Sequence, residues 1–326
     1  MTAVVTGAAG HIGVNLVRAL RERGDRVRAV VHRRDGRFEG LGVEEVPGDV
    51  LDPASLRRAF AGAEVVYHLA AVISITGDRG GLVHRVNVDG AANVAEAALE
   101  AGADRLVHCS SIHAFDLDPG PEVLDESAPR IAPGSRRHPA YDLSKADGER
   151  GVRAVMDRGL DAVVVHPTSV LGPADLEPSR LGRVLLRVRD RRLRLMVAGG
   201  FDFVDVRDVA GGLMAAADRG AAGSSYLLGG RYATIAELVG IAAAAAGVRP
   251  PRVAVPKGLA RLGTPFATAA GWVRRSEPLY TAESLRALRL TSRVDWSAAA
   301  ADLGYRPRPL EDSVADLYRW FAGEGM

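Results

Sequence analysis

Short apolar runs alternate with longer segments of helical periodicity along the first half of the chain. The runs are four or five residues long and are bounded by glycine or charged residues, which is typical of strands buried on both faces. They predict strands over 2–6, 27–31, 43–46, 64–68, 105–108 and 162–166. Helical patterns lie between them, from Leu16 to a stop at Gly24, over 86–101 and over 140–156. Such alternation predicts a parallel sheet with right-handed crossovers.

The alternation weakens after Pro173. In this second half the pattern predicts helices over 180–192, 207–218, 235–246, 258–273, 282–288 and 310–321, and strands over 203–206 and 225–228. The segment 116–139 is rich in Pro, Gly and Asp and is too long for a simple connection, so it is expected to be a functional loop. The second half is therefore expected to hold a smaller, mixed α/β substrate domain.

The first strand runs directly into a glycine-rich turn and then a helix, the context that a dinucleotide-binding loop requires. Gly7 permits the tight turn, Gly10 admits a pyrophosphate to the backbone, and Gly13 lets the helix pack on the strand. Phosphates would sit at the helix N-terminus, where free amides favour anions. Other cofactor contacts are expected from Ala9, His11, Ile12, Asp49, Val50, Leu69, Ala70 and Ala71.

The second strand ends in a basic cluster, where a site that prefers NAD usually carries an acidic residue for the ribose 2′-hydroxyl. Positive charge at this position suits a 2′-phosphate. The sequence therefore favours NADP(H), with His32 and Arg33 as the contacts, while NAD(H) stays possible.

Tyr141 and Lys145 are four residues apart, so on a helix they lie on one face, one turn from each other. An ammonium beside a phenol favours the phenolate, and we expect the pKa of Tyr141 to fall toward neutrality. Lys145 and Lys257 are the only lysines in the chain, whereas the other basic side chains are arginine or histidine. A compact ammonium at this position indicates a ribose contact that arginine could not make in the same way.

Composition narrows the compartment and the classes of partner that the protein is expected to have. The chain has 326 residues, a net charge of +2 and one cysteine, Cys109, so no intrachain disulfide forms and the cytoplasm is the expected compartment. The charge demands neither nucleic acid nor an anionic membrane as partner. No apolar run is long enough to span a bilayer. No metal site is predicted.

With Thr6-Gly7-x-x-Gly10-x-x-Gly13, Ser111 and Tyr141-x-x-x-Lys145 in this order, the chain resembles an extended short-chain dehydrogenase/reductase over nearly its whole length. The resemblance implies a Rossmann doubly wound parallel sheet with helices on both faces. It places the nucleotide-binding domain at 1–166 plus about 201–228 and the substrate domain at 167–200 and 229–326. A homodimer is also implied.

The resemblance further implies the site. Ser111, Tyr141 and Lys145 match the catalytic residues, and Ser111 is preferred to Ser110 because it lies three residues before the small residue Ala114. Tyr141 and Lys145 also contact the cofactor. Pro167, Thr168 and Ser169 would lie beside the nicotinamide, and Asn87 would support a water near Lys145.

The sequence is less specific about the substrate and the residues that would bind it. Phe201-Asp202 stands where nucleotide-sugar enzymes of the family usually carry Arg-Asp, and 201–210 is similar to dihydroflavonol-reductase-like members. The favoured function is reduction of an aromatic, alicyclic or natural-product-like ketone. The alternatives are a sugar or nucleotide-sugar epimerase or dehydratase, a hydroxysteroid dehydrogenase and a non-catalytic cofactor sensor. Candidate substrate-binding residues are Val72, Ile73, His113, Leu171, Met196 and Phe203.

Overall fold

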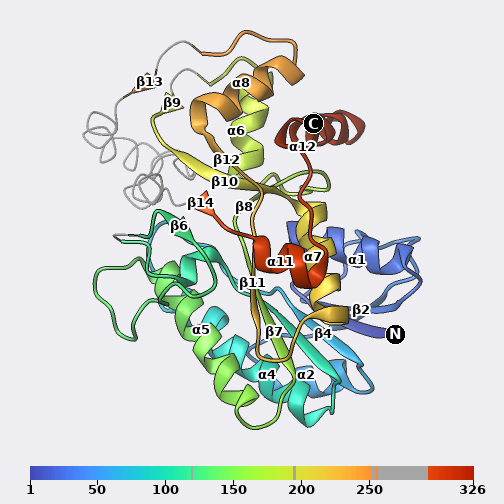
Figure 1. Cartoon of the computed structure of the whole chain (residues 1–326). Helices are drawn as coiled ribbons and strands as arrows, with labels where there is room; N and C mark the ends of the chain where they lie inside the picture. Colours follow the sequence, from blue (N-terminus) through green and yellow to red (C-terminus); the bar gives the residue numbers. More distant parts are fainter. Residues whose placement is uncertain (119, 194–195, 252–253, 256–292) are drawn as a thin grey trace.

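A seven-stranded parallel sheet forms the centre of the molecule (Figure 1). The computed structural model describes residues 1–326 except 119, 194–195, 252–253 and 256–292. The strand order is β11-β7-β5-β4-β1-β2-β3, and each neighbouring pair is parallel. The strands are β1 (Thr2–Thr6), β2 (Arg26–Val31), β3 (Glu44–Pro47), β4 (Val65–His68), β5 (Arg105–Cys109), β7 (Ala162–Pro167) and β11 (Ser225–Leu228). The order reverses between β1 and β4, which is where open α/β sheets bind their ligands.

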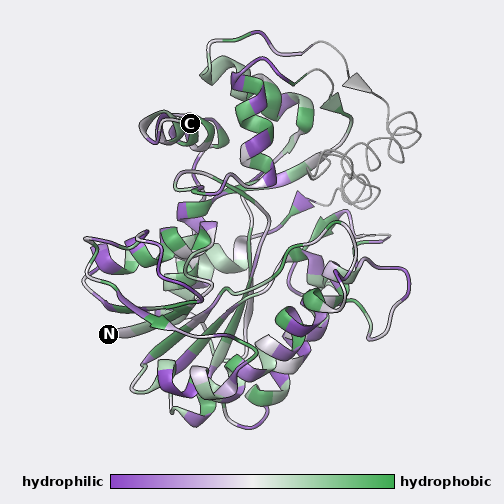
Figure 2. Ribbon diagram, turned by 180° about the vertical axis from the view of Figure 1, so that it is seen from behind, coloured by the Kyte–Doolittle hydropathy of each residue, from purple (hydrophilic) through white to green (hydrophobic). Residues whose placement is uncertain are grey.

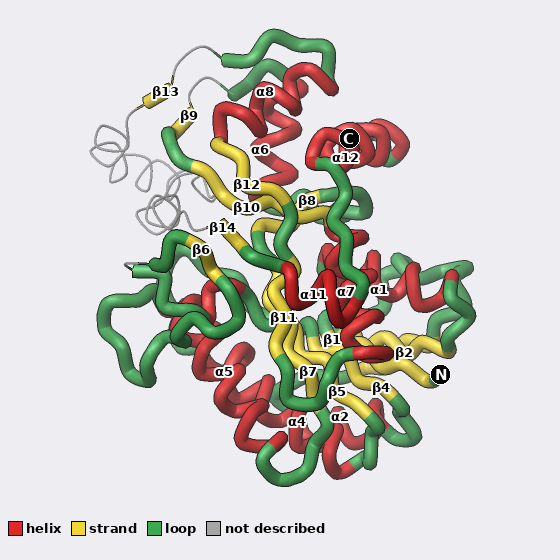
Figure 3. The backbone as a smooth tube through the Cα atoms, viewed as in Figure 1, coloured by secondary structure: helices red, strands yellow, loops and turns green. Residues whose placement is uncertain are grey.

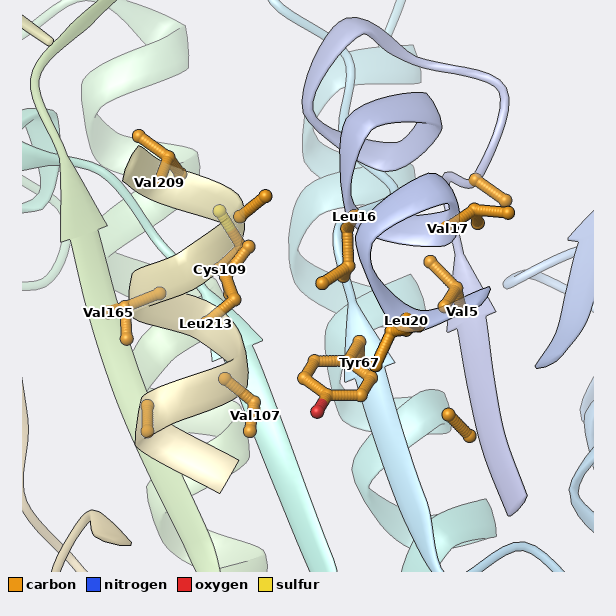
Figure 4. Close-up of a cluster of buried hydrophobic side chains, with 14 of the residues drawn as sticks. Val5, Leu16, Val17, Leu20, Tyr67, Val107, Cys109, Val165, Val209 and Leu213 are labelled. Atoms are coloured by element: carbon orange, nitrogen blue, oxygen red, sulfur yellow. The ribbon is translucent and has the colours of Figure 1, made fainter. Parts of the chain in front are cut away.

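Helices cover both faces of this sheet. On one face lie α1 (His11–Glu22) and α7 (Val206–Arg219), and on the other lie α2 (Pro53–Phe60), α4 (Gly90–Glu100) and α5 (Ala140–Met156). Successive side chains of a strand point to opposite faces of the sheet. Val5 therefore packs in the core beneath α1 and α7, and Val4 packs in the core beneath α2, α4 and α5. Figure 4 shows Val5 and Tyr67 from the sheet against Leu16 and Leu20 of α1.

A smaller unit is built on a second sheet, of order β12-β10-β8 (Figure 3). Its strands are β8 (Ser169–Leu171), β10 (Gly200–Asp205) and β12 (Arg231–Thr234). The helices α6 (Arg180–Arg189), α8 (Ile235–Ala245) and α12 (Leu310–Gly323) share its apolar core. Two short pairs complete the strands, β9 (Met196–Val197) with β13 (Ala254–Val255) and β6 (Val123–Leu124) with β14 (Arg293–Val294). A last helix, α11 (Ser297–Leu303), packs into the core of the large sheet.

The Rossmann architecture predicted from the alternating pattern is confirmed, and the strand bounds agree to within a residue or two. The helix predicted over 86–101 differs. The chain there forms α3 (Leu82–His84), a π-helical turn (Arg85–Asp89) and α4, and the Asn87 carbonyl of the turn lies close to Gly148 of α5. In the smaller unit, β10 begins at Gly200, three residues before the strand predicted over 203–206. The strands β8 and β12 and the helices α2 and α11 carry too few residues for a periodic signal and were not predicted.

Two of the predicted helices, 258–273 and 282–288, lie outside the described residues. Figure 2 shows apolar residues concentrated in the central strands and on the inner faces of the helices. No helix in the described part of the chain is long and apolar enough to cross a membrane.

Candidate active site

Tyr141 is the second residue of α5, at the carboxyl edge of the large sheet. Burial of the phenol raises the pKa of Tyr141 above its ordinary value, and a hydrogen bond with the Ser111 side chain opposes this only in part. The negative charge of Asp142 raises the pKa further. The expectation of a lowered phenol pKa is therefore wrong for the protein without cofactor, because desolvation outweighs the stabilising contacts.

Lys145 lies one turn further along α5 and is buried. Its Nζ donates a hydrogen bond of 3.0 Å to the carbonyl oxygen of Cys109, the last residue of β5. Burial lowers the pKa of Lys145, whereas the charge of Glu149 raises it. The ammonium is thus anchored on the strand that leads to Ser111.

The two serines after β5 have different surroundings. Ser111 begins a short 3₁₀ turn (Ile112–Ala114), and its hydroxyl accepts a hydrogen bond of 3.2 Å from the backbone N–H of His113. Ser110 lies 3.4 Å from Glu149 through its hydroxyl. Ser111 therefore lies on the Tyr141 side, and Ser110 belongs to a separate buried cluster.

His113 stands beside Tyr141, with 5.5 Å between the ring centroids. Its Nδ1 lies 3.0 Å from Oδ1 of Asp142, which is itself buried. His113 is partly exposed next to the phenol, in keeping with a position at the edge of the site.

The Asn87 side chain makes three hydrogen bonds within the protein. Its Oδ1 accepts from the Val72 N–H at 2.7 Å, and its Nδ2 donates to the Val72 carbonyl at 3.0 Å and to the Ser144 hydroxyl at 2.9 Å. The Ser144 hydroxyl donates in turn to the Tyr141 carbonyl at 2.7 Å. Asn87 thus connects the segment after β4 to the Tyr141 turn.

The glycine loop between β1 and α1 fits a nicotinamide dinucleotide. A Cβ on Gly13 would lie 2.2 Å from the Gly7 carbonyl oxygen, and one on Gly7 would lie 2.5 Å from the Ala70 nitrogen. These approaches bring the loop, the helix N-terminus and the segment after β4 together. No side chain caps α1 and no acidic residue stands in its first turn, so its amides suit a pyrophosphate.

Neighbouring residues of the loop brace it. The Nε2 of His11 lies 3.1 Å from the Gly172 carbonyl and 3.0 Å from the Pro173 carbonyl, joining the loop to the smaller unit. The His11 side chain is thus held by protein atoms.

The segment beyond β2 contains a residue, Arg37, that the sequence did not single out. His32 and Arg33 are exposed beyond β2, where they were expected. Arg37 donates a short hydrogen bond to the Ala9 carbonyl and pairs with Asp35. Its position in a loop of irregular conformation gave no periodic signal that could have placed it there.

Asp49 and Val50 follow β3, with the Asp49 carboxylate accepting from the Leu51 N–H at 2.9 Å. Val50 is buried against Gly90. Leu69, Ala70 and Ala71 follow β4, and the first two are partly exposed while Ala71 is exposed.

The remaining predicted residues fall into two groups. Val72 and Ile73 follow β4, Ile73 being 63% exposed, and Pro167, Thr168 and Ser169 follow or end β7 beside the β5 end. Leu171, Met196 and Phe203 belong instead to the buried core of the smaller unit. Their side chains are at most 7% exposed, so in this conformation they pack in the interior of the smaller unit.

A parallel sheet with this order and an uncapped glycine loop at its switch point are typical of dinucleotide-binding proteins. The chain belongs to the NAD dependent epimerase/dehydratase family, whose model matches residues 3–229, and it is an enzyme of the extended short-chain dehydrogenase/reductase type that uses a nicotinamide cofactor.

Two curated relatives match along the whole chain. Sterol demethylase protein B of Methylococcus capsulatus is 37% identical and covers 100% of both chains. A putative dihydroflavonol 4-reductase of Synechocystis is 30% identical and covers 98% of this chain and 94% of the relative. Among solved structures, the crystal structure of gox2253 has a TM-score of 0.83 at 31% identity, covering 99% of this chain and 98% of that chain.

Proposed function

We propose that this protein is an NADP(H)-dependent oxidoreductase that reduces a ketone on a bulky, largely apolar substrate to an alcohol. The observation that carries the proposal is the convergence of Ser111, Tyr141 and Lys145 at the end of β5 and the start of α5. A bound NADPH would supply the hydride to the carbonyl carbon.

The protein's own groups would handle the oxygen and its proton. Tyr141, kept protonated by burial, donates its proton to the developing alkoxide, and Ser111 holds that oxygen by a hydrogen bond. Lys145 contributes positive charge and the ribose contact. Positioned acid catalysis of this kind contributes typically about 10²–10⁴-fold.

An alicyclic ketone such as a sterol ketone is the substrate class that we favour. The full-length similarity to a protein named sterol demethylase protein B supports it, as does similarity to a putative dihydroflavonol reductase. In addition, the position where a nucleotide-sugar enzyme needs a cation holds Phe201, which packs against the core of the smaller unit. An aromatic ring there offers nothing to a diphosphate.

NADP(H) preference rests on the exposed basic residues His32 and Arg33 after β2. The measurement is a pair of dissociation constants, for NADPH and for NADH, on wild type and on Arg33→Ala. We expect tighter NADPH binding in the wild type and a weakened preference in the variant. A wild-type preference for NADH would overturn this part of the proposal.

The test of function is NADPH oxidation against a panel of steroid ketones, other alicyclic and aromatic ketones, and nucleotide sugars. We expect one alcohol formed per NADPH consumed with an apolar ketone, and a loss of at least about 10²-fold in Tyr141→Phe with NADPH binding retained. Conversion of a nucleotide sugar without net NADPH consumption would show an epimerase or dehydratase instead.

A further inference from the structure

Glu149 is a buried carboxylate that the proposed reaction does not use. It is 1% exposed and lies one turn beyond Lys145 on α5. Its Oε2 accepts a hydrogen bond of 2.8 Å from Nε2 of His166. Its Oε1 lies 3.2 Å from Nε of Arg130 and 2.8 Å from the guanidinium of Arg153.

These partners come from several of the segments that border the active site. His166 directly precedes Pro167 at the end of β7, and Ser110, which contacts the same carboxylate at 3.4 Å, directly precedes Ser111 after β5. Arg130 comes from the long segment before α5 and stacks over the Phe115 ring at 3.8 Å. One carboxylate therefore joins β5, β7, α5 and this segment.

The charge state of the cluster follows from its contacts. Burial opposes ionisation of Glu149, but the hydrogen bond from His166 and the charges of Arg130 and Arg153 outweigh it, so the pKa of Glu149 lies well below its usual range. Burial lowers the pKa of His166, which is fully buried. At neutral pH Glu149 is thus an anion facing a neutral imidazole.

Lys145 needs such an anion, because its surroundings disfavour its charge. Burial lowers its pKa, and only Cys109 and Glu149 among the described groups acting on it favour the ammonium. The imidazoles nearest on the sheet, His68 and His108, are buried and hold pKa values below the ordinary one, through burial first and the Lys145 charge among the other causes. Burial raises the pKa of the Cys109 thiol to about 11, so it is neutral at pH 7.

We propose that Glu149 is a positioning residue that keeps Lys145 protonated and holds the ends of β5 and β7 in register with α5. The role of Lys145 in catalysis rests on the proposed function, but the effect of Glu149 on the ammonium does not. It is a property of the folded chain and can be measured without any substrate.

The experiment uses the rarity of lysine in this chain. Protein labelled with [6-¹³C]lysine has two labelled positions, Lys145 and Lys257, and the variant Lys257→Arg assigns the remaining signal to Lys145. The ¹³Cε shift is followed against pH in the apo protein. In Glu149→Gln we expect the Lys145 midpoint to move to lower pH, a roughly tenfold loss of proton affinity, because an anion about one helical turn away is removed.

Two further variants make the result specific. Arg153→Gln removes a cation that neutralises Glu149, and its half-exposed position spares the fold, so the Lys145 midpoint should move to higher pH. Asp147→Asn removes a carboxylate from the same helix that pairs with Arg150 outside the cluster, and it should leave the midpoint unchanged. Opposite shifts in the first two variants and none in the third are the expected pattern.

An unchanged Lys145 midpoint in Glu149→Gln, or in Arg153→Gln if the first variant does not fold, would overturn the proposal. A ketone screen without any turnover would leave the titration result standing, so the two proposals fail separately. Where turnover is found, kcat of Glu149→Gln should begin to fall at a lower pH than kcat of the wild type, with KM for the ketone little changed.

Discussion

At the scale of single residues, the phenol of Tyr141 shows how packing reverses a local expectation. Spacing to Lys145 correctly places both side chains on one helix face, but burial raises the phenol's pKa, and the ammonium is turned to the Cys109 carbonyl. A neutral phenol is the form needed to donate a proton. The ionised form needed for the reverse reaction becomes costly.

The raised pKa of Tyr141 predicts a difference between the two directions of the reaction. Ketone reduction should change little between pH 6 and 8, because the phenol stays protonated throughout. Alcohol oxidation needs the phenolate, so kcat/KM for oxidation should rise roughly tenfold per pH unit over the same range. Steady-state rates in both directions check this, with Tyr141→Phe as the control that should lose both. An oxidation rate that is flat with pH would contradict it.

Three buried histidines, His68, His108 and His166, predict loss of stability in acid. Burial lowers the pKa of all three, that of His68 to about 3, so below about pH 6.5 the unfolded chain binds protons that the folded chain does not. Stability is therefore present above pH 6.5 and falls as pH decreases, by up to about 1.4 kcal/mol per pH unit for each histidine.

Urea unfolding between pH 7.5 and 5 measures this slope. His108→Asn should reduce the slope by the contribution of one histidine, whereas His84→Asn, at an exposed position, should leave it unchanged. A wild-type stability independent of pH over this range would show that the histidines are protonated in the fold.

At the scale of elements, the contact between α5 and the π-helical turn positions the Tyr141 end of the helix. A Cβ on Gly148 would lie 2.2 Å from the Asn87 carbonyl oxygen, so α5 approaches the turn through a glycine. The same asparagine bonds Val72 and Ser144. The fit of this pair holds the segment after β4 against the catalytic helix.

Two glycines of α5 give a matched test of this contact. Gly148→Ala must move the backbone at Asn87 and should destabilise the protein by about 1–3 kcal/mol, as overpacking does. Gly151→Ala would place its Cβ 3.5 Å from that of Ala92, an ordinary contact, and should stabilise by about 0.5–1 kcal/mol through helix propensity. Thermal unfolding of both variants measures the two stability changes. Equal changes would mean that the π-helical turn shifts to accommodate the added Cβ without loss of stability.

Sequence predicted the large sheet well because most of its strands are apolar and alternate with periodic helices, a local signal. The π-helical turn at Asn87 was not predicted, since its contact with Gly148 joins residues about 60 positions apart in sequence. The hydrogen bond between Glu149 and His166 was not predicted for the same reason. His166 lies in a predicted buried strand, but nothing in the residues around it indicates its partner.

At the scale of the whole molecule, the C-terminal segment packs into both cores. Residues 293–294 pair with the segment before α5, Ala299 and Leu303 of α11 enter the core of the large sheet, and α12 enters that of the smaller unit. Between these helices, Arg308 pairs with Asp208 of α7 at 2.8 Å. The two units therefore share one continuous piece of chain.

This sharing predicts that the two units unfold together, and two tryptophans can report on them. Trp296 contacts Tyr305 at the large sheet, whereas Trp320 lies on α12. The double variants Trp272→Phe/Trp320→Phe and Trp272→Phe/Trp296→Phe leave one reporter each. The fluorescence of both variants should give the same urea midpoint. NADPH at about 100 times its dissociation constant should raise the free energy of unfolding reported by each tryptophan by the same roughly 2.7 kcal/mol. A lower midpoint at Trp320 that NADPH leaves unchanged would instead mean that the smaller unit opens independently, so that substrate entry could occur without disturbing the bound cofactor.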